Sequence, residues 1–137
     1  LDGELFRRTA AKYGSGVELI TAPGRGFVEL VESDRESTPE AEQAVRDAVA
    51  VMLEHGADQI VLGCTHYPFL LPVLERVVAG RGVEIVDPSP AVARRVVQLL
   101  DRYGLHVDPA HRAEYTFRTF ADEAYRLRLE RKALGAL

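Results

Sequence analysis

The sequence predicts an α/β fold with a parallel sheet, and three observations lead to that prediction. Short apolar runs alternate with longer helical patterns, which is the order of elements in βαβ units. The run 59–62 is almost uninterrupted by polar residues, as in a parallel strand covered by helices on both faces. With 137 residues and a hydrophobic content of 47%, the chain can bury a real core as one domain.

The first part of the chain predicts a helix, a strand and a short helical segment. Apolar side chains recur at helical spacing over residues 3–13, and the compact apolar run 17–21 is expected to be a strand. A turn at 22–26 follows. Residues 27–32 then predict one or two helical turns, with a strand as the alternative for so short a run.

The middle of the chain carries the clearest alternation of helices and strands. Thr38, Pro39 and Glu40 favour a helix start, because they supply an N-cap hydroxyl, a first-turn proline and an acid at the positive helix end. The strand 59–62 follows this helix, and residues 68–78 form the next predicted helix.

The last part of the chain continues this alternation and then changes character. Residues 83–86 predict another strand, and 91–103 predict a long amphipathic helix. Residues 114–120 alternate with period two and are expected to be an exposed or edge strand, and 121–134 a charged terminal helix. The expected fold is therefore a set of parallel-sheet βαβ layers with an additional carboxyl-terminal strand and helix.

Composition argues against several classes of function. The net charge of −4 disfavours a nucleic-acid partner, which would require a basic surface. Lys12 and Lys132 are the only lysines, so few candidates exist for the Schiff base of a pyridoxal phosphate enzyme. A single cysteine cannot form an internal disulfide, so a reducing cytoplasm is the expected location. No apolar run approaches the ~20 residues that span a bilayer, so no membrane partner is expected.

The most informative segment is the turn that follows the strand 59–62. Gly63, Cys64, Thr65 and His66 stand between an apolar run and a proline suited to opening a helix. An open α/β sheet binds its ligands at the carboxyl ends of its strands. The sequence therefore predicts that the chemistry of this protein takes place at this turn.

Cys64 can act as an acid or a base if its thiolate is populated, although a free thiol is mostly protonated at neutral pH. The positive end of the following helix and the imidazole of His66 both favour the thiolate. The alternative is an inert cysteine buried in the core, which is common for free cysteines. Cys64 and His66 alone lack the further ligands that a zinc site needs, so no metal is expected.

The neighbouring polar residues admit a functional and a structural interpretation. Thr65 can hold a substrate carboxylate at the helix start or simply cap the helix. His66 can be a general acid or base, or a structural hydrogen-bonding residue. Glu29 and Glu32 are surface acids unless one of them lies against His66, where it would increase the basicity of the imidazole. Asp87 follows a strand on the same sheet edge and can cap the next helix or line the ligand crevice.

The run 63–70, Gly-Cys-Thr-His-Tyr-Pro-Phe-Leu, resembles the second-cysteine motif of the glutamate racemases. Residues 27–32, Phe-Val-Glu-Leu-Val-Glu, are similar to a family segment that ends in Leu-Val-Glu. Residues 57–58 and 85–88 also resemble the family. The resemblance covers residues 1–103, whereas the remaining tail departs from the usual family ending.

The resemblance implies cofactor-independent interconversion of L- and D-glutamate by a two-base mechanism, for peptidoglycan synthesis. It implies that Cys64 exchanges the α-proton of the L-enantiomer, that His66 is its proton partner, and that Glu32 orients His66. Thr65 would bind the substrate together with Cys64 and His66. The family also implies a homodimer and needs no cofactor.

The resemblance further implies a second cysteine, which acts on the opposite face of the substrate. The chain has only one cysteine, so it is expected to be the carboxyl-terminal portion of such an enzyme and to be inactive alone. Residues 1–88 would form the second lobe, which carries the Cys-Thr-His turn. Residues 89–137 would return to pack on a missing amino-terminal lobe.

Two alternative functions stay open at this point. One is a racemase of the same superfamily with another substrate, such as aspartate or a hydantoin. His66 and the Tyr67-Pro68 pair disfavour it, since related aspartate racemases typically carry an acid where His66 stands. The other is a non-catalytic module that binds an amino acid or a partner protein.

Overall fold

The computed structural model describes residues 3–135, and its elements confirm the predicted α/β class. Within this range the strands are β1 (Gln59–Val61) and β2 (Glu84–Val86), joined by a crossover through α4 (Leu71–Val78). The other elements are α1 (Glu4–Tyr13), α2 (Phe27–Glu32), α3 (Pro39–Glu54), the 3₁₀ turn η1 (Tyr67–Leu70), α5 (Ser89–Tyr103) and α6 (Glu123–Gly135).

The sheet is small and parallel, as predicted. β1 pairs with β2 in a register that places Ile60 opposite Ile85. The pairing extends past β1, because the Leu62 amide donates to the Val86 carbonyl at 3.0 Å. The chain leaves the sheet directly after Leu62, and this fixes the start of the Cys-Thr-His turn.

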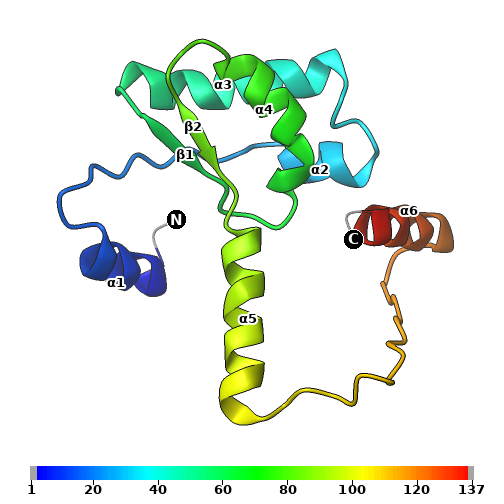
Figure 1. Cartoon of the computed structure of the whole chain (residues 1–137). Helices are drawn as coiled ribbons and strands as arrows, with labels where there is room; N and C mark the ends of the chain where they lie inside the picture. The colour runs from blue at the N-terminus through cyan, green and yellow to red at the C-terminus, as the bar shows by residue number, and fades with distance from the viewer. Residues whose placement is uncertain (1–2, 136–137) are drawn as a thin grey trace.

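The core lies between the sheet and the helices α2, α3 and α4 (Figure 1). α3 begins where the sequence predicts, since the Thr38 hydroxyl accepts a hydrogen bond from the Ala41 amide at 3.3 Å. Its buried residues Ala41, Val45 and Val49 recur at helical spacing, and the helix contacts α4 and α2. The buried core residues are Phe27, Leu30, Val31, Ala41, Val45, Val49, Ile60, Leu62, Leu70, Val73, Leu74, Val77 and Val78.

The prediction that β1 is covered on both faces is wrong for the described part of the chain. Ile60 is 4% exposed, whereas its neighbour Val61 is 63% exposed. Successive side chains of a strand point to opposite faces, so only one face of β1 is packed by the helices. An apolar composition alone did not show that the second face is open.

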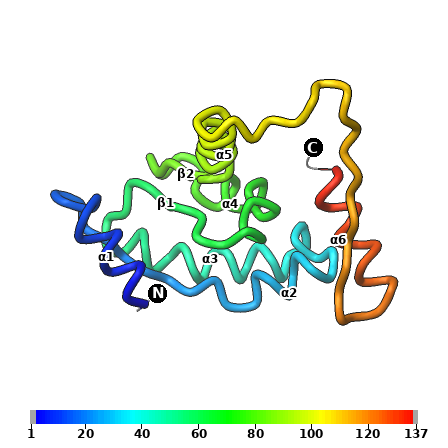
Figure 2. The backbone as a smooth tube through the Cα atoms, turned by 90° about the horizontal axis from the view of Figure 1, so that it is seen from below, coloured from blue at the N-terminus to red at the C-terminus, as the bar shows by residue number. Residues whose placement is uncertain are grey.

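The two strands predicted at 17–21 and 114–120 are also wrong, because neither segment forms a strand. Residues 114–120 run far from the sheet, whereas the segment after α1 passes behind β1 on its way to α2 without pairing with it (Figures 1 and 2); Val17 and Tyr115 are 61% and 65% exposed. A strand needs a hydrogen-bonded neighbour, and no strand among residues 3–135 pairs with either segment. Both segments have the apolar pattern of a strand, but no neighbouring strand in the described chain pairs with them.

Two of the predicted helices project from the packed layers. α5 extends as a separate rod and α1 lies apart from the core (Figure 1). Their apolar side chains are open to solvent: Leu5 of α1 is 79% exposed, and Val92 and Val96 of α5 are 59% and 51% exposed. The terminal helix α6, in contrast, returns to contact α2. None of the helices described combines the length and apolar character needed to cross a bilayer.

Candidate active site

The Cys-Thr-His turn lies at the carboxyl end of β1, where the sequence places it. The Tyr67 amide donates to the Cys64 carbonyl at 3.1 Å, which closes the turn. The Phe69 amide then donates to the His66 carbonyl at 3.2 Å and starts η1. Pro68 fits the first turn of η1, because it has no amide hydrogen that would need an acceptor.

The turn brings the thiol and the imidazole together. Cys64 Sγ lies 3.9 Å from His66 Nδ1, which is within hydrogen-bond range for sulfur. Both residues are only partly buried, so the pair is not enclosed in the core. The alternative of a cysteine fully buried in the core is therefore wrong for Cys64.

Glu32 completes a line of three polar side chains. It is the last residue of α2, and its Oε1 lies 3.3 Å from His66 Nε2. The two side chains are 29% and 28% exposed. If the neutral imidazole carries its proton on Nε2, beside the carboxylate, Nδ1 is the acceptor that faces the thiol of Cys64.

α2 and η1 pack against one another and thereby set this geometry. The rings of Phe27 in α2 and Tyr67 in η1 meet edge to face, with centroids 5.2 Å apart and planes at 71°. Burial and the neighbouring charges of Cys64 and Glu29 raise the pKa of Tyr67 above 10.0, whereas a hydrogen bond from the Gly24 backbone acts in the opposite direction. Tyr67 therefore connects the Cys-Thr-His turn to α2 and to the 22–26 loop.

Gly24 is needed for this contact because there is no room for a side chain. A Cβ at this position would lie 2.6 Å from Tyr67 Oη and 2.5 Å from Phe27 Cδ2. Sequence analysis did not detect this role, nor that of Tyr67 in holding the turn. The sequence shows a glycine between a proline and an arginine, but this pattern does not indicate that Tyr67 packs against the glycine.

The remaining predicted site residues lie around the turn with different contacts. Thr65 is exposed beside Cys64. Asp87 acts as a cap: its Oδ1 accepts hydrogen bonds from the Ser89 amide at 2.9 Å and the Ser89 hydroxyl at 2.6 Å. The structural interpretation thus accounts for Asp87. Glu29 is exposed and lies close enough to influence Tyr67.

Two surface hollows of the described chain lie away from the turn. One is between the end of α4 and β2, and the other is beside the start of α3, and neither is lined by Cys64, Thr65 or His66. The turn is therefore a candidate site because of its residue types and their distances, and not because of the shape of the surface. Among residues 3–135 no group of three His, Cys, Asp or Glu side chains is arranged to hold a metal ion.

Comparison with known proteins identifies the family of the chain. A family model described as Asp/Glu/Hydantoin racemase matches residues 2–96. The glutamate racemase of Roseiflexus sp. (strain RS-1) is 42% identical over 105 residues, which make up 77% of this chain and 38% of that protein. The chain belongs to the Asp/Glu/Hydantoin racemase family, as the motif at 63–70 predicts.

Solved glutamate racemase structures share the fold. The enzyme from Francisella tularensis subsp. tularensis SCHU S4, in complex with D-glutamate, superposes with a TM-score of 0.81 at 20% identity, over 95% of this chain and 48% of that one. The Thermus thermophilus enzyme, in complex with beta-chloro-D-alanine, gives a TM-score of 0.70 at 31% identity, over 91% and 48%. The chain thus spans about half the length of these structures.

Proposed function

We propose that this chain supplies one of the two acid–base centres of a cofactor-independent glutamate racemase. The observation that carries the proposal is the line Cys64–His66–Glu32 at the carboxyl end of β1, with separations of 3.9 and 3.3 Å. A thiol, an imidazole and a carboxylate in this order form a proton relay whose first member is only partly buried.

In the proposed reaction Cys64, as a thiolate, removes the α-proton of L-glutamate. The pair of electrons left on Cα gives a planar carbanion, and a second acid on the opposite face returns a proton to form D-glutamate. In the reverse direction the thiol of Cys64 donates the proton. The carbanion needs electrostatic support and exclusion of water, since no cofactor accepts its charge.

The neighbours of Cys64 would serve this step in distinct ways. His66 Nδ1 takes the thiol proton before the reaction, and the Glu32 carboxylate stabilises the imidazolium that forms. Thr65 would bind the α-carboxylate or the amino group with its hydroxyl and its amide. His66 and Tyr67-Pro68 favour glutamate over aspartate as the substrate, and D-glutamate would be used in peptidoglycan synthesis in the cytoplasm.

The second acid–base group would come from a further segment, because Cys64 is the only cysteine among these 137 residues. In this proposal residues 1–88 form the lobe that carries the relay, and 89–137 belong to a region that packs on another lobe, although α6 within that region also contacts α2. The open apolar side chains of α1 and α5 support that arrangement, since apolar patches of this kind are normally covered. The assembled enzyme would be a homodimer.

Racemisation by the gene product that carries these residues tests the proposal. We expect Cys64→Ser and His66→Ala to lower the turnover of both enantiomers by about 10²-fold or more, as loss of a general acid–base group does. His55→Ala is the matched control, because His55 lies at the end of α3 and bonds only the Val51 carbonyl. Unchanged turnover in Cys64→Ser would refute the catalytic role.

The substrate is tested in the same assay with a panel of amino acids. The unsubstituted protein is expected to racemise glutamate and to leave aspartate and hydantoins unchanged. Faster turnover of aspartate or of a hydantoin would show that glutamate is not the preferred substrate, but would leave the proposed role of the relay unchanged. Binding of glutamate without any exchange of its α-hydrogen for solvent deuterium would favour a non-catalytic module.

A further inference from the structure

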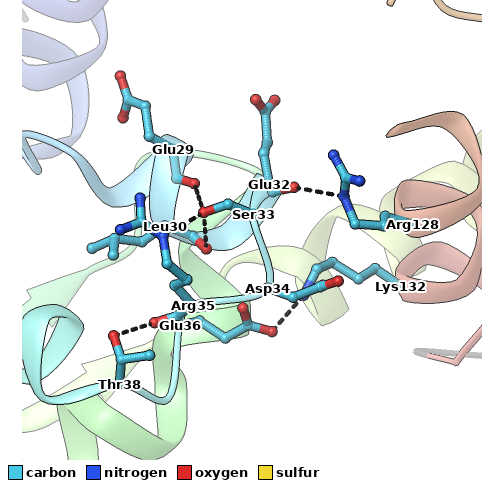
Figure 3. Close-up of polar contacts among 10 residues, drawn as sticks. All are labelled: Glu29, Leu30, Glu32, Ser33, Asp34, Arg35, Glu36, Thr38, Arg128 and Lys132. Carbon is cyan, nitrogen blue, oxygen red and sulfur yellow. Dashed lines mark hydrogen bonds and ion pairs between the residues drawn. The ribbon is translucent and has the colours of Figure 1, made fainter. Parts of the chain in front are cut away.

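The terminal helix α6 contacts the end of α2 and the turn that follows it (Figure 3). Arg128 Nε donates to the Glu32 carbonyl at 3.4 Å. Lys132 Nζ lies 2.8 Å from Asp34 Oδ1 and also donates to the Glu36 carboxylate. Segments that are 96 residues apart in the sequence thus meet at the residue that ends the relay.

The turn that Lys132 contacts is the one that closes α2. The Arg35 amide donates to the Leu30 carbonyl at 2.8 Å, a bond that ends a helix through one residue in the left-handed conformation. Asp34 is that residue, with a φ angle of 55°, at a position where glycine is usual and other residues are strained. Because this strain favours opening of the turn, a contact that holds Asp34 also fixes the end of α2, where Glu32 stands.

Lys132 occupies a nearly closed site. Its side chain is only 12% exposed. Burial opposes the charge of Lys132, but the hydrogen bonds to Asp34 and Glu36 outweigh burial and raise the pKa of the ammonium group. The hydrogen bond from Lys132 lowers the pKa of Asp34 in return. The second carboxylate oxygen of Glu36 is buried and has no hydrogen-bond partner among residues 3–135, so the charge of Glu36 depends on Lys132 for compensation.

The ammonium group of Lys132 also meets the segment that carries His66. Lys132 Nζ lies 5.7 Å from the centroid of the Phe69 ring, which belongs to η1. The Phe69 amide donates to the His66 carbonyl at 3.2 Å, so the ring and the imidazole stand on the same short stretch of chain. One cation therefore contacts both segments whose side chains meet in the 3.3 Å contact between Glu32 and His66.

We infer that Lys132 is a positioning residue for the relay, because it holds the turn after α2 against η1 and thereby keeps the Glu32 carboxylate beside His66. This inference rests on the proposed function of the relay. The side chains of Glu32 and His66 are 29% and 28% exposed, and Glu32 ends a helix of only six residues, so core packing alone does not fix their contact. A cation that bridges the two segments limits how far the carboxylate can move from the imidazole.

The reactivity of Cys64 toward iodoacetamide reports the relay in the 137-residue chain, because Cys64 is the only cysteine. The rate is followed from about pH 6 to about pH 9, the range in which imidazole and thiol titrate. We expect Lys132→Met to slow alkylation at neutral pH by about two- to fivefold, the effect of weakening one hydrogen bond, because less thiolate is present. At about pH 9 the rate should approach that of the unsubstituted chain, since the thiol then loses its proton without the relay.

Lys12→Met is the matched control. Lys12 is the other lysine of the chain, it is exposed on α1, and its Nζ also lies near an aromatic ring, 4.9 Å from the centroid of Tyr13. The substitution removes the same charge at a site that contacts neither α2 nor η1 in the described structure. The alkylation profile of Lys12→Met should therefore equal that of the unsubstituted chain.

Two further variants separate positioning from a general loss of structure. In a Glu32→Ala background, Lys132→Met should have no further effect on the alkylation profile, because Lys132 acts through Glu32. Asp34→Asn keeps a residue that tolerates the left-handed conformation and removes only one charge that Lys132 bonds, so it should slow alkylation in the same direction by a smaller factor. Circular dichroism checks that each variant retains its helices. If Lys132→Met loses them, Asp34→Asn decides, and an unchanged profile for it would overturn the inference.

The outcomes distinguish this inference from the proposed function. If Glu32→Ala and His66→Ala slow alkylation but a folded Lys132→Met does not, Lys132 has no positioning role and the relay stands. If Lys132→Met slows alkylation equally with and without Glu32, its effect bypasses the carboxylate and the inference is wrong. If none of these three substitutions changes the profile, the relay itself is refuted.

Discussion

Replacing Gly24 by alanine tests whether close packing on Tyr67 holds the Cys-Thr-His turn in place. The backbone of Gly24 approaches Tyr67 so closely that an added Cβ would lie 2.6 Å from Oη and 2.8 Å from Cζ of that ring. It would also lie 2.5 Å from Phe27 Cδ2. Phe27 is 5% exposed and its ring packs on Tyr67, so neither ring can move without disturbing the other.

The expected cost follows from this overlap. Inserting a methyl group into a packed site costs about 1–3 kcal/mol, because side chains or backbone must shift to accept it. The φ angle of Gly24 is not positive, so no backbone strain adds to the steric cost. We therefore expect Gly24→Ala to lower the free energy of unfolding by about 2 kcal/mol.

Urea denaturation followed by circular dichroism measures this change. With a slope of about 1–3 kcal/mol per molar urea, the midpoint should fall by roughly 1 M. Gly63→Ala is the matched control: a Cβ at Gly63 meets nothing within 4 Å, so its midpoint should stay or rise slightly. Equal midpoints for the two variants would refute the reasoning that Gly24 makes room for Tyr67.

Two further predictions concern the core and the docking of α6. Leu70 is 0% exposed, so Leu70→Ala should lower the free energy of unfolding, measured in urea, by about 2–5 kcal/mol. Leu5 is 79% exposed, so Leu5→Ala should change this free energy little. Similar costs for the two variants would contradict the described core. Docking of α6 should be complete from pH 3.8, the ordinary pKa of Asp34, to 10.5, that of Lys132. The folded state lowers the pKa of Asp34 and raises the pKa of Lys132. Docking is therefore lost as the pH falls through the lowered pKa of Asp34, or as it rises through the raised pKa of Lys132. Hydrogen exchange of α6 measures this, and loss near neutral pH would contradict it.

Helices could be predicted from the sequence where local signals fix them. α3 is the clearest case, since Thr38 and Pro39 define its start and its apolar residues recur at helical spacing. The strands at 17–21 and 114–120 could not be judged in this way, because a strand also depends on a partner elsewhere in the chain. The open face of β1 at Val61 was hidden for the same reason.

The candidate site divides in a similar way. Cys64 and His66 are two residues apart, so the sequence itself indicated that they meet at the turn. Glu32 was named from the resemblance to a family, and the structure places it 3.3 Å from His66. The role of Gly24 could not be found from the sequence, because its contact with Tyr67 depends on how distant segments pack together.

The connection between α5 and α6 decides how strongly α6 must bind. Residues 105–122 form no helix or strand, and their side chains are exposed except for that of Phe117. A tether of this length has an end-to-end distance of roughly 25 Å if it behaves as a flexible coil. It would then keep α6 at an effective concentration in the millimolar range beside α2. At such an effective concentration, a few ion pairs suffice to hold α6 on α2. A single proteolytic cut in the tether would turn this contact into one between two molecules, and α6 would then dissociate on dilution.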